Sequence, residues 1–180
     1  MKVLVISDIH GSGYYAEKIK EINEKEQPDK IILLGDIYYH GPRNNLSQEY
    51  EPMKVAQILN SLKDKLSVVK GNCDAEVDQW LVDFPIISEM GCIMIDGISM
   101  YITHGHKYNY ENKPPMCPHD ILIFGHTHVP FAEDCEDGIF INPGSVSIPK
   151  EGSKNSYLIY ENGVFLWKDL DGEVYKSLEL

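Results

Sequence analysis

The chain has 180 residues, 43% of them hydrophobic and 24% charged, so it can bury the core of one domain without disulfide support. Its 28 acidic and 16 basic residues give a formal charge of −12, which repels long polyanions and argues against a stable nucleic-acid complex. No apolar run approaches the ~20 residues of a membrane span. The four scattered cysteines, without a CxxC pair, are typical of a reducing compartment. We therefore expect a cytoplasmic protein with no membrane partner, folded as a single domain over residues 1–180.

The first 70 residues predict strands that alternate with helices. Apolar runs at residues 3–6, 31–34 and 68–69 are typical of buried strands. Between them, residues 14–26 and 52–62 carry apolar side chains at helical spacing. An alternation of strand and helix predicts parallel pairing of the strands in one sheet.

The second half of the chain predicts short strands joined by tight turns. Asp96-Gly97, Asn162-Gly163 and Asp171-Gly172 each lie between apolar or alternating runs, and such dipeptides are strong hairpin signals. We expect these antiparallel elements to form a second sheet packed on the first. The proline-rich residues 114–118 predict a surface loop, and no repeat or linker divides the chain.

Potential metal ligands follow the apolar runs at five predicted strand ends, including the runs at residues 100–102 and 121–124. In an open α/β sheet, ligands bind at the carboxyl ends of the strands, so we expect these side chains to meet at one edge. In chain order they are Asp8, His10, Asp36, Asn72, His104, His126 and His128.

Most of these motifs are weak signals when taken alone. Asp8-x-His10 is more often an ordinary turn, Gly35-Asp36 is a turn signal, and Asn72 alone would be a capping residue. Gly125-His126-Thr127-His128 is more specific, because two histidines follow an apolar strand on a loop that begins with glycine.

Together the motifs predict two metal sites that share one carboxylate. Carboxylate, amide and imidazole ligands without thiolate suit Mn²⁺, Fe²⁺ or Zn²⁺. Two such cations about 3.5–4 Å apart would activate a bridging hydroxide and clamp the oxygens of a phosphoryl group. The first site would comprise Asp8, His10, Asp36 and His128, and the second would comprise Asp36, Asn72, His104 and His126, with Asp36 bridging.

These motifs resemble the pattern of the calcineurin-like metallophosphoesterase superfamily, and the resemblance covers nearly the whole chain. It extends to the bacterial YfcE-type phosphodiesterases through residues 40–44, 71–74, 103–106, 125–128 and 142–147. The resemblance implies an α/β fold in which a two-sheet β-sandwich is flanked by helices, in the order α/β/β/α. It also implies the same division of the seven ligands between two cations, with Mn²⁺ as the expected metal.

The chain departs from the superfamily pattern at two positions. The superfamily often has Gly-Asn-His-Asp, in which the histidine assists the leaving group, but here Cys73 replaces that histidine. A thiol with a reference pKa of ~8.5 is a weak acid catalyst. Asp74 remains, and we expect it to hydrogen-bond a neighbouring ligand or histidine. The Gly-Asp-x-x-Asp pattern also ends differently, with Tyr39 at its last position.

Four further residues are candidates for catalytic roles: Asp74, Arg43, His40 and His106. Arg43 and His40 lie in a loop that could reach the site, and the fork of Arg43 matches two phosphate oxygens, although a plain surface arginine is an equal alternative. His106 is either the missing acid or a structural histidine.

The leading hypothesis is a dinuclear metal phosphodiesterase that hydrolyses a small phosphodiester through a metal-bridging hydroxide. One alternative is a phosphomonoesterase, phosphoprotein phosphatases included. Another is a non-catalytic interaction scaffold, as the retromer subunit of this fold exemplifies. The complete set of seven ligands favours an enzyme over a scaffold. The sequence leaves the physiological substrate, the native metal and any homo-oligomer open.

Overall fold

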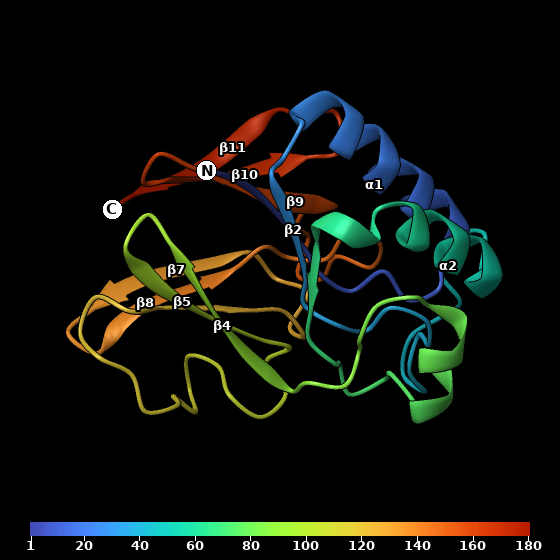
Figure 1. Ribbon diagram of the computed structural model, residues 1–180, viewed down its shortest axis with the longest axis horizontal. Coiled ribbons are helices and arrows are strands. Elements are labelled where there is room, and N and C mark those ends of the chain that lie inside the picture. Colours follow the sequence, from blue (N-terminus) through green and yellow to red (C-terminus); the bar gives the residue numbers. More distant parts are fainter.

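A computed structural model describes residues 1–180 as two stacked β-sheets with helices against the first (Figure 1). The first sheet has the order β11-β10-β9-β1-β2-β3 and the second the order β4-β5-β6-β8-β7. None of the helices combines the length and apolar composition that a membrane crossing requires. The elements are β1 (Lys2–Ile6), α1 (Gly13–Glu26), β2 (Lys30–Leu33), α2 (Pro52–Ser61), β3 (Leu66–Val68), β4 (Met90–Ile95), β5 (Ile98–Thr103), β6 (Ile121–Phe124), β7 (Phe131–Cys135), β8 (Gly138–Asn142), β9 (Ser156–Glu161), β10 (Val164–Asp169) and β11 (Val174–Glu179), with short 3₁₀ helices η1 (Lys63–Lys65) and η2 (Glu76–Leu81).

The first sheet joins the two ends of the chain. Strands β1, β2 and β3 pair in parallel, as the alternation of strand and helix predicts. Strand β9 returns antiparallel to β1 and continues into β10 and β11 through two turns. At the first of these turns, Asn162 and Gly163 have φ of 52° and 82°, the left-handed pair that a tight hairpin requires.

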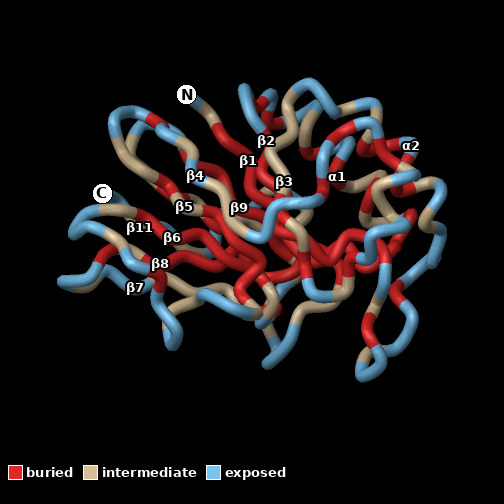
Figure 2. Tube along the Cα trace, turned by 60° about the horizontal axis from the view of Figure 1, so that its bottom comes forward, coloured by how far each residue is buried: buried red, intermediate tan, exposed pale blue.

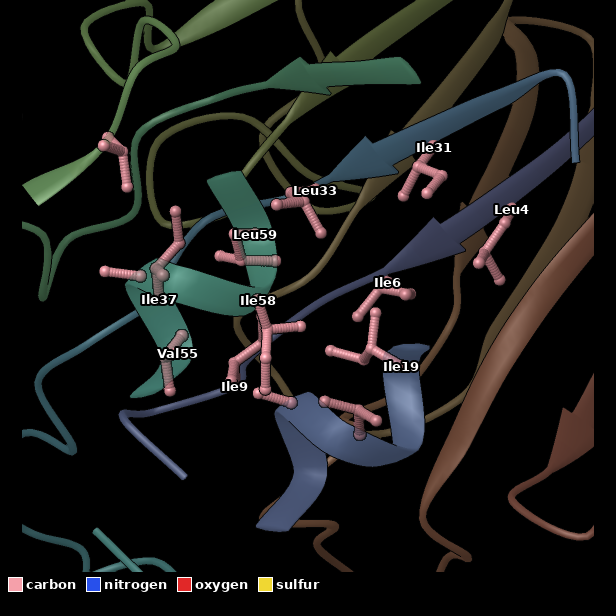
Figure 3. Close-up of a cluster of buried hydrophobic side chains, with 14 of the residues drawn as sticks. Leu4, Ile6, Ile9, Ile19, Ile31, Leu33, Ile37, Val55, Ile58 and Leu59 are labelled. Carbon is pink, nitrogen blue, oxygen red and sulfur yellow. The ribbon is translucent and has the colours of Figure 1, made fainter. Parts of the chain in front are cut away.

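One apolar layer lies between the first sheet and the two helices (Figure 3). Alternate residues of β1, Leu4 and Ile6, face this layer and meet Ile19 of α1 and Val55 of α2. The helices bury only one face each, which is why their apolar residues recur at helical spacing. Their burial fixes the loops that leave β1 and β2.

A second apolar layer lies between the two sheets. The intervening residues of β1, Val3 and Val5, face Ile121 and Ile123 of β6. Both faces of the central strands are therefore buried, as the tube of Figure 2 shows, and this is why their sequences are continuously apolar. The expectation that all three hairpins form the second sheet is wrong, because those at Asn162-Gly163 and Asp171-Gly172 belong to the first sheet. The second sheet is also mixed rather than antiparallel throughout, because β5, β6 and β8 run parallel to one another.

The predicted two-sheet sandwich flanked by helices is confirmed, with one difference in its outer layers. Helices α1 and α2 lie on the first sheet only, whereas the outer face of the second sheet carries Leu122, Phe124 and Phe140 under a loop. Tyr110 and Met116 of that loop cover them. The prolines of residues 114–118 explain the absence of a helix, because proline lacks the backbone N–H and disfavours helix in the residue before it.

Glu26, at the last turn of α1, links this helix to three strands of the first sheet. Its carboxylate is buried and accepts a hydrogen bond from Tyr157 (2.9 Å) and pairs with Lys168 (2.7 Å) and Lys2 (2.9 Å). Burial favours a higher pKa, but these three partners outweigh it and lower the pKa of Glu26 from 4.5 to about 2. The ionised carboxylate therefore stabilises the fold.

We predict that Glu26→Gln lowers the free energy of unfolding at pH 7 by about 3 kcal/mol, because it leaves two lysines near a neutral group. The folded-state pKa is lower than the unfolded one, so the contribution is complete above pH 4.5 and is lost as the pH falls towards 2. Urea unfolding at pH 7 and pH 3 measures this, and the gap between the two proteins should narrow at pH 3. An equal gap at both values would contradict the assignment.

Candidate metal centre

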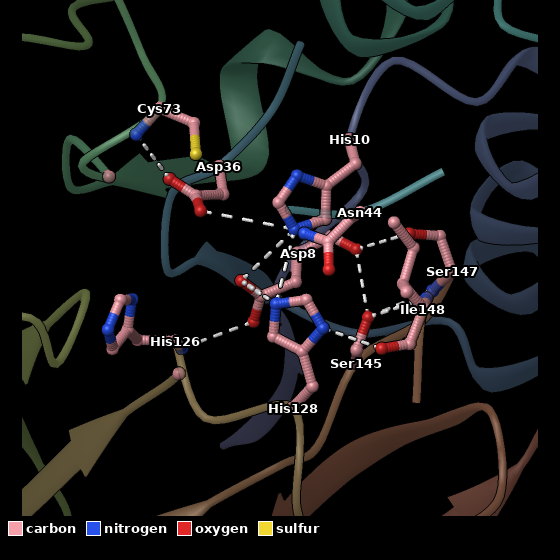
Figure 4. Close-up of polar contacts among 12 residues, drawn as sticks. Asp8, His10, Asp36, Asn44, Cys73, His126, His128, Ser145, Ser147 and Ile148 are labelled. Atoms are coloured by element: carbon pink, nitrogen blue, oxygen red, sulfur yellow. Dashed lines mark hydrogen bonds and ion pairs between the residues drawn. The ribbon is translucent and has the colours of Figure 1, made fainter. Parts of the chain in front are cut away.

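The predicted ligands meet where parallel strands of both sheets end. Asp8 and His10 follow β1, Asp36 follows β2, and His126 and His128 follow β6. These five residues have φ between 51° and 68°, a left-handed conformation that is uncommon outside glycine and costs on the order of 1–3 kcal/mol each. Sharp turns of this kind direct side chains from successive loop positions inward (Figure 4).

Two glycines let the loops after β2 and β3 approach each other. Gly35 has φ of 89°, and a Cβ at this position would collide with the backbone of Gly71. A Cβ at Gly71 would in turn collide with the carboxylate of Asp36. These two positions require glycine because the backbones touch, and the contact places Asp36 beside Asn72.

A first ligand group consists of Asp8, His10 and His128, all buried. The Nε2 atoms of His10 and His128 lie 3.2 Å apart. Asp8 Oδ1 lies 3.6 Å from the former and 3.3 Å from the latter. The three atoms thus surround one point from three directions, as the ligands of a single cation would.

A second ligand group consists of Asp36, His104 and His126, with Asn72 beside them. His104 Nε2 lies 3.0 Å from Asn72 Oδ1, 3.2 Å from His126 Nδ1 and 3.3 Å from Asp36 Oδ2. Asp36 Oδ2 is also 3.9 Å from His10 Nε2, in the first group. This single oxygen faces both groups, which is the geometry of a bridging ligand.

The histidines in these groups turn lone pairs towards the carboxylates. The Nδ1 atoms of His10, His104 and His128 lie 2.7, 2.7 and 2.5 Å from backbone carbonyl oxygens, so each Nδ1 donates a hydrogen. In the neutral ring Nε2 is then an acceptor. Asp8 Oδ1 is buried with no hydrogen-bond donor, among acceptors only. Acceptors that face one another in a dry site need a positive charge between them, which a metal ion or the proton of a charged histidine can supply, so these residues fit a metal ion.

The pKa shifts of the histidines and carboxylates in the two groups also indicate that positive charge is favourable in this site. Burial alone would lower the pKa of His104, but Asp36 and Asp8 raise it to about 9. Burial and the neighbouring His104 lower the pKa of His126 to about 4. Burial would raise the pKa of Asp8, yet His10 and His128 hold it well below its usual range. Positive charge at this position, from a protonated histidine or a metal ion, therefore stabilises the carboxylates of Asp8 and Asp36.

Asp74 hydrogen-bonds the ligand residue Asp36, as expected, but through the backbone of Asp36 rather than its side chain. Its carboxylate accepts backbone N–H bonds from Asp36 (2.9 Å), Ile37 (2.7 Å) and Gly71 (2.8 Å). Burial raises the pKa of Asp74, and these amides oppose that effect. We correct its role from catalytic to positioning, because it joins the loops after β2 and β3 and faces backbone rather than the cation positions.

Cys73 lies against the second ligand group. Its backbone N–H donates to Asp36 Oδ1 (2.8 Å), which leaves only Oδ2 of that carboxylate to face both groups. Its sulfur accepts from the side-chain amide of Asn72 (3.3 Å). Burial and the charge of Asp36 raise the pKa of the thiol to about 12, which keeps it protonated when no cation is bound. The sulfur also lies with His10 and Asp36 in a third group of potential metal ligands.

A pocket of about 270 Å³ opens onto both ligand groups. Arg43 lines this pocket, the position expected of a phosphate clamp.

His40 and His106 do not line this pocket. The ring of His40 stacks edge-on against Tyr39 and Tyr50, and His106 lies in a separate cavity beyond Asn72. Neither histidine therefore lines the pocket that contains the ligands.

Two groups of residues at this site are absent from the sequence-based set. Lys150 lines the pocket, although nothing in its sequence context distinguishes it from other surface lysines. Ser145 and Ser147 donate to the backbone carbonyl of Asp8 (3.0 and 2.6 Å) and hold its unusual conformation. Both serines belong to the motif at residues 142–147, and they act here through their hydroxyl groups.

Comparison with known proteins identifies the family. The model of the calcineurin-like phosphoesterase superfamily domain matches residues 1–162. The chain is 43% identical over 164 residues to phosphodiesterase YfcE of Escherichia coli K12, which covers 91% of this chain and 89% of that protein. It is 28% identical over 151 residues to phosphodiesterase MJ0936 of Methanocaldococcus jannaschii, covering 80% and 83% of the two chains.

Solved structures agree with this result. The structure described as YfcE, a phosphoesterase from E. coli, superposes with a TM-score of 0.96 at 39% identity and covers 99% of both chains. Vps29 of Entamoeba histolytica, complexed with Zn²⁺, has a TM-score of 0.65 at 21% identity, with 99% of each chain covered, and shares the fold. The chain belongs to the calcineurin-like phosphoesterase superfamily and is a hydrolase of that family.

Proposed function

We propose that this protein is a dinuclear metal-dependent phosphodiesterase that hydrolyses a small phosphodiester. The observation that carries the proposal is the pair of ligand groups joined by Asp36 Oδ2, which faces His10 in one group and His104 in the other. The likeness to YfcE, a phosphodiesterase, supports the substrate class. Mn²⁺, Fe²⁺ and Zn²⁺ suit the mixed ligands, and Mn²⁺ is our first choice.

The seven candidate ligands would be divided between two metal ions. Asp8, His10 and His128 would hold one cation, Asn72, His104 and His126 the other, and Asp36 both. When bound, the two cations would supply charge neutralisation for the phosphoryl oxygens and an activated water as nucleophile.

Residues that hold no metal would orient the substrate. Arg43, on the pocket wall, would donate its paired N–H groups to a non-bridging phosphoryl oxygen and fix the angle of attack. The protonated thiol of Cys73 would supply no acid of useful strength, so the departing alcohol would need to leave with little proton transfer.

A small substrate fits both the pocket and the surface charge. The cavity of about 270 Å³ suits a diester with short arms. The formal charge of −12 opposes long polyanions such as nucleic acid. An interaction scaffold would not need seven competent ligands, five of them held in strained turns, so the enzyme hypothesis is favoured over that alternative.

We predict that the purified protein contains two divalent transition-metal ions per chain and loses activity in chelator. Asp36→Asn should lower metal content to one ion or fewer and lower kcat/KM by at least about a hundredfold, equivalent to about 2.7 kcal/mol. Asn72→Ala should cost less, because it removes a neutral ligand from one cation only. Elemental analysis and kinetics on an aryl phosphodiester provide the measurement.

Asp134→Asn, the same change at an exposed position on β7, is the matched control and should leave both quantities unchanged. An Asp36→Asn protein with full activity and two ions per chain would refute the bridging assignment.

We predict that Cys73→Ser keeps activity within roughly tenfold of the parent, equivalent to about 1.4 kcal/mol, because the thiol is protonated and donates no acid. Cys73→His should raise activity towards diesters with poor leaving groups. Kinetics at constant metal content measure both effects. A loss of more than about a thousandfold in Cys73→Ser, equivalent to about 4 kcal/mol, would instead show that the sulfur takes part in the chemistry.

We predict that aryl phosphodiesters are hydrolysed with higher kcat/KM than the matched phosphomonoesters. A monoester has nearly two negative charges and three free oxygens, so it can occupy the positions that the ligand groups leave for the nucleophile. A diester has one charge and two free oxygens, and the pocket offers no imidazolium at residue 73 to expel a monoester's alkoxide. The measurement uses matched substrates with Mn²⁺, and a clear preference for the monoester would favour the phosphatase alternative.

A further inference from the structure

A second cavity of about 400 Å³ adjoins the pocket at the ligand groups. The two cavities share three wall residues, Arg43, Asn44 and Lys150, so these side chains lie at the junction. The rest of the second cavity is formed by residues that precede α2 or follow β8, together with one residue of α1. These residues are Tyr15, Asn45, Leu46, Ser47, Gln48, Ser147 and Ile148.

The charge of this second cavity is opposite to that of the protein. The chain has 28 acidic residues, yet no Asp or Glu lines the cavity, and both charged residues in its wall are cationic. One of them, Arg43, is the only arginine in the sequence. A concave surface with uncompensated positive charge on an acidic protein concentrates anions.

The side chains of Arg43 and Lys150 also form no ion pair. Some surface lysines pair with carboxylates, as Lys107 does with Glu89 and Lys154 with Asp169. Arg43 and Lys150 form no such ion pair, and no carboxylate lines the second cavity beside them. The backbone of Lys150 is fixed, because its N–H donates to the carbonyl of His128 (3.3 Å). This hydrogen bond to the metal ligand His128 therefore fixes the position of the Lys150 backbone, from which its side chain extends.

A third cavity, on the other side of Asn72, has a different character. It shares Asn72 with the metal pocket and is lined by two acidic residues, Asp74 and Glu89, as well as Lys70 and His106. Glu89 pairs with Lys107, and Asp74 accepts backbone N–H groups, so the charge of the third cavity is mixed. Among these cavities, only in the second are all the charged wall residues cationic.

We propose that the second cavity is a substrate subsite and that Lys150 is its specificity-determining residue. The substrate class is a phosphodiester with an additional anionic group, a carboxylate or a phosphate, on one of its arms. The phosphodiester group lies at the ligand groups, and the charged arm extends past Arg43 to Lys150. This inference rests on the proposed function and narrows its substrate class.

The test uses pairs of p-nitrophenyl phosphodiesters that differ only in charge. Each pair has an alkyl arm or a carboxyalkyl arm of equal length, with two to five methylene groups in the series. With Mn²⁺ present, at least one carboxyalkyl diester should have a kcat/KM about tenfold higher than its alkyl partner, mainly through KM. A tenfold ratio corresponds to about 1.4 kcal/mol of added binding.

The variants then assign the preference to one side chain. In Lys150→Met the ratio of kcat/KM for the charged and uncharged members should fall to about one, and Lys150→Arg should restore it. Lys20→Met, at an exposed position on α1, makes the same change in net charge and should keep the parent ratio. No preference in the parent at any arm length, or a preference that survives in Lys150→Met, would overturn the proposal.

A binding measurement separates this inference from the proposed function. Isothermal titration calorimetry of the same pairs with metal-free protein in chelator should show tighter binding of the carboxyalkyl member, lost in Lys150→Met. If neither member is hydrolysed with metal but this difference persists, the phosphodiesterase proposal fails and the anion subsite stands. If hydrolysis occurs without any difference in binding or kcat/KM, the subsite fails and the enzyme proposal stands.

Discussion

The buried carboxylate oxygen Oδ1 of Asp8 faces the Nε2 atoms of two histidines and no hydrogen-bond donor. A cluster of acceptors without compensating charge is costly in a dry environment, so it persists only where the surrounding structure holds it in place. The apolar layers on both faces of β1 provide that rigidity. The hydroxyl groups of Ser145 and Ser147 then fix the carbonyl of Asp8 itself.

Rigidity also explains the role of the residues around Asp36. Asp74 binds the backbone on both sides of the contact between the loops after β2 and β3, and the amide of Cys73 holds Asp36 Oδ1. The carboxylate is thereby oriented with one oxygen towards both ligand groups. The backbone of residue 73, not its side chain, orients the carboxylate of Asp36. The replacement of histidine by Cys73 therefore leaves the bridging geometry intact and changes only the acid available to the leaving group.

The electrostatics of the molecule are uneven around this centre. Two carboxylates attract cations into the ligand groups, while Arg43 and Lys150 present positive charge where the pocket opens into its neighbour. Beyond Asn72 the wall is partly acidic. On a protein with a formal charge of −12, such a gradient orients a charged ligand before any specific contact forms.

The sequence by itself determined the parts of this protein that depend on local chemistry. Apolar runs located the central strands, Asn162-Gly163 marked a hairpin by requiring positive φ, and polar residues after strand ends identified all seven candidate ligands. Their convergence also followed, because parallel strands end at a common edge. Their division between two sites is what the resemblance to the superfamily implies. Strand β7 was not anticipated, since its residues 133–134 are exposed and acidic and its pairing with β8 supplies the signal instead.

Only the tertiary structure decided features that depend on distance between remote segments. Asp74 was expected to hydrogen-bond a ligand or a histidine, and only the approach of two loops at Gly35 and Gly71 shows that its partners are backbone amides, that of Asp36 included. His40 and His106 have the right chemistry for catalysis and lie outside the pocket. Lys150 became significant only because its backbone pairs with His128 across the fold. A sequence pattern records which groups a chain carries, whereas long-range packing sets which of their atoms face each other.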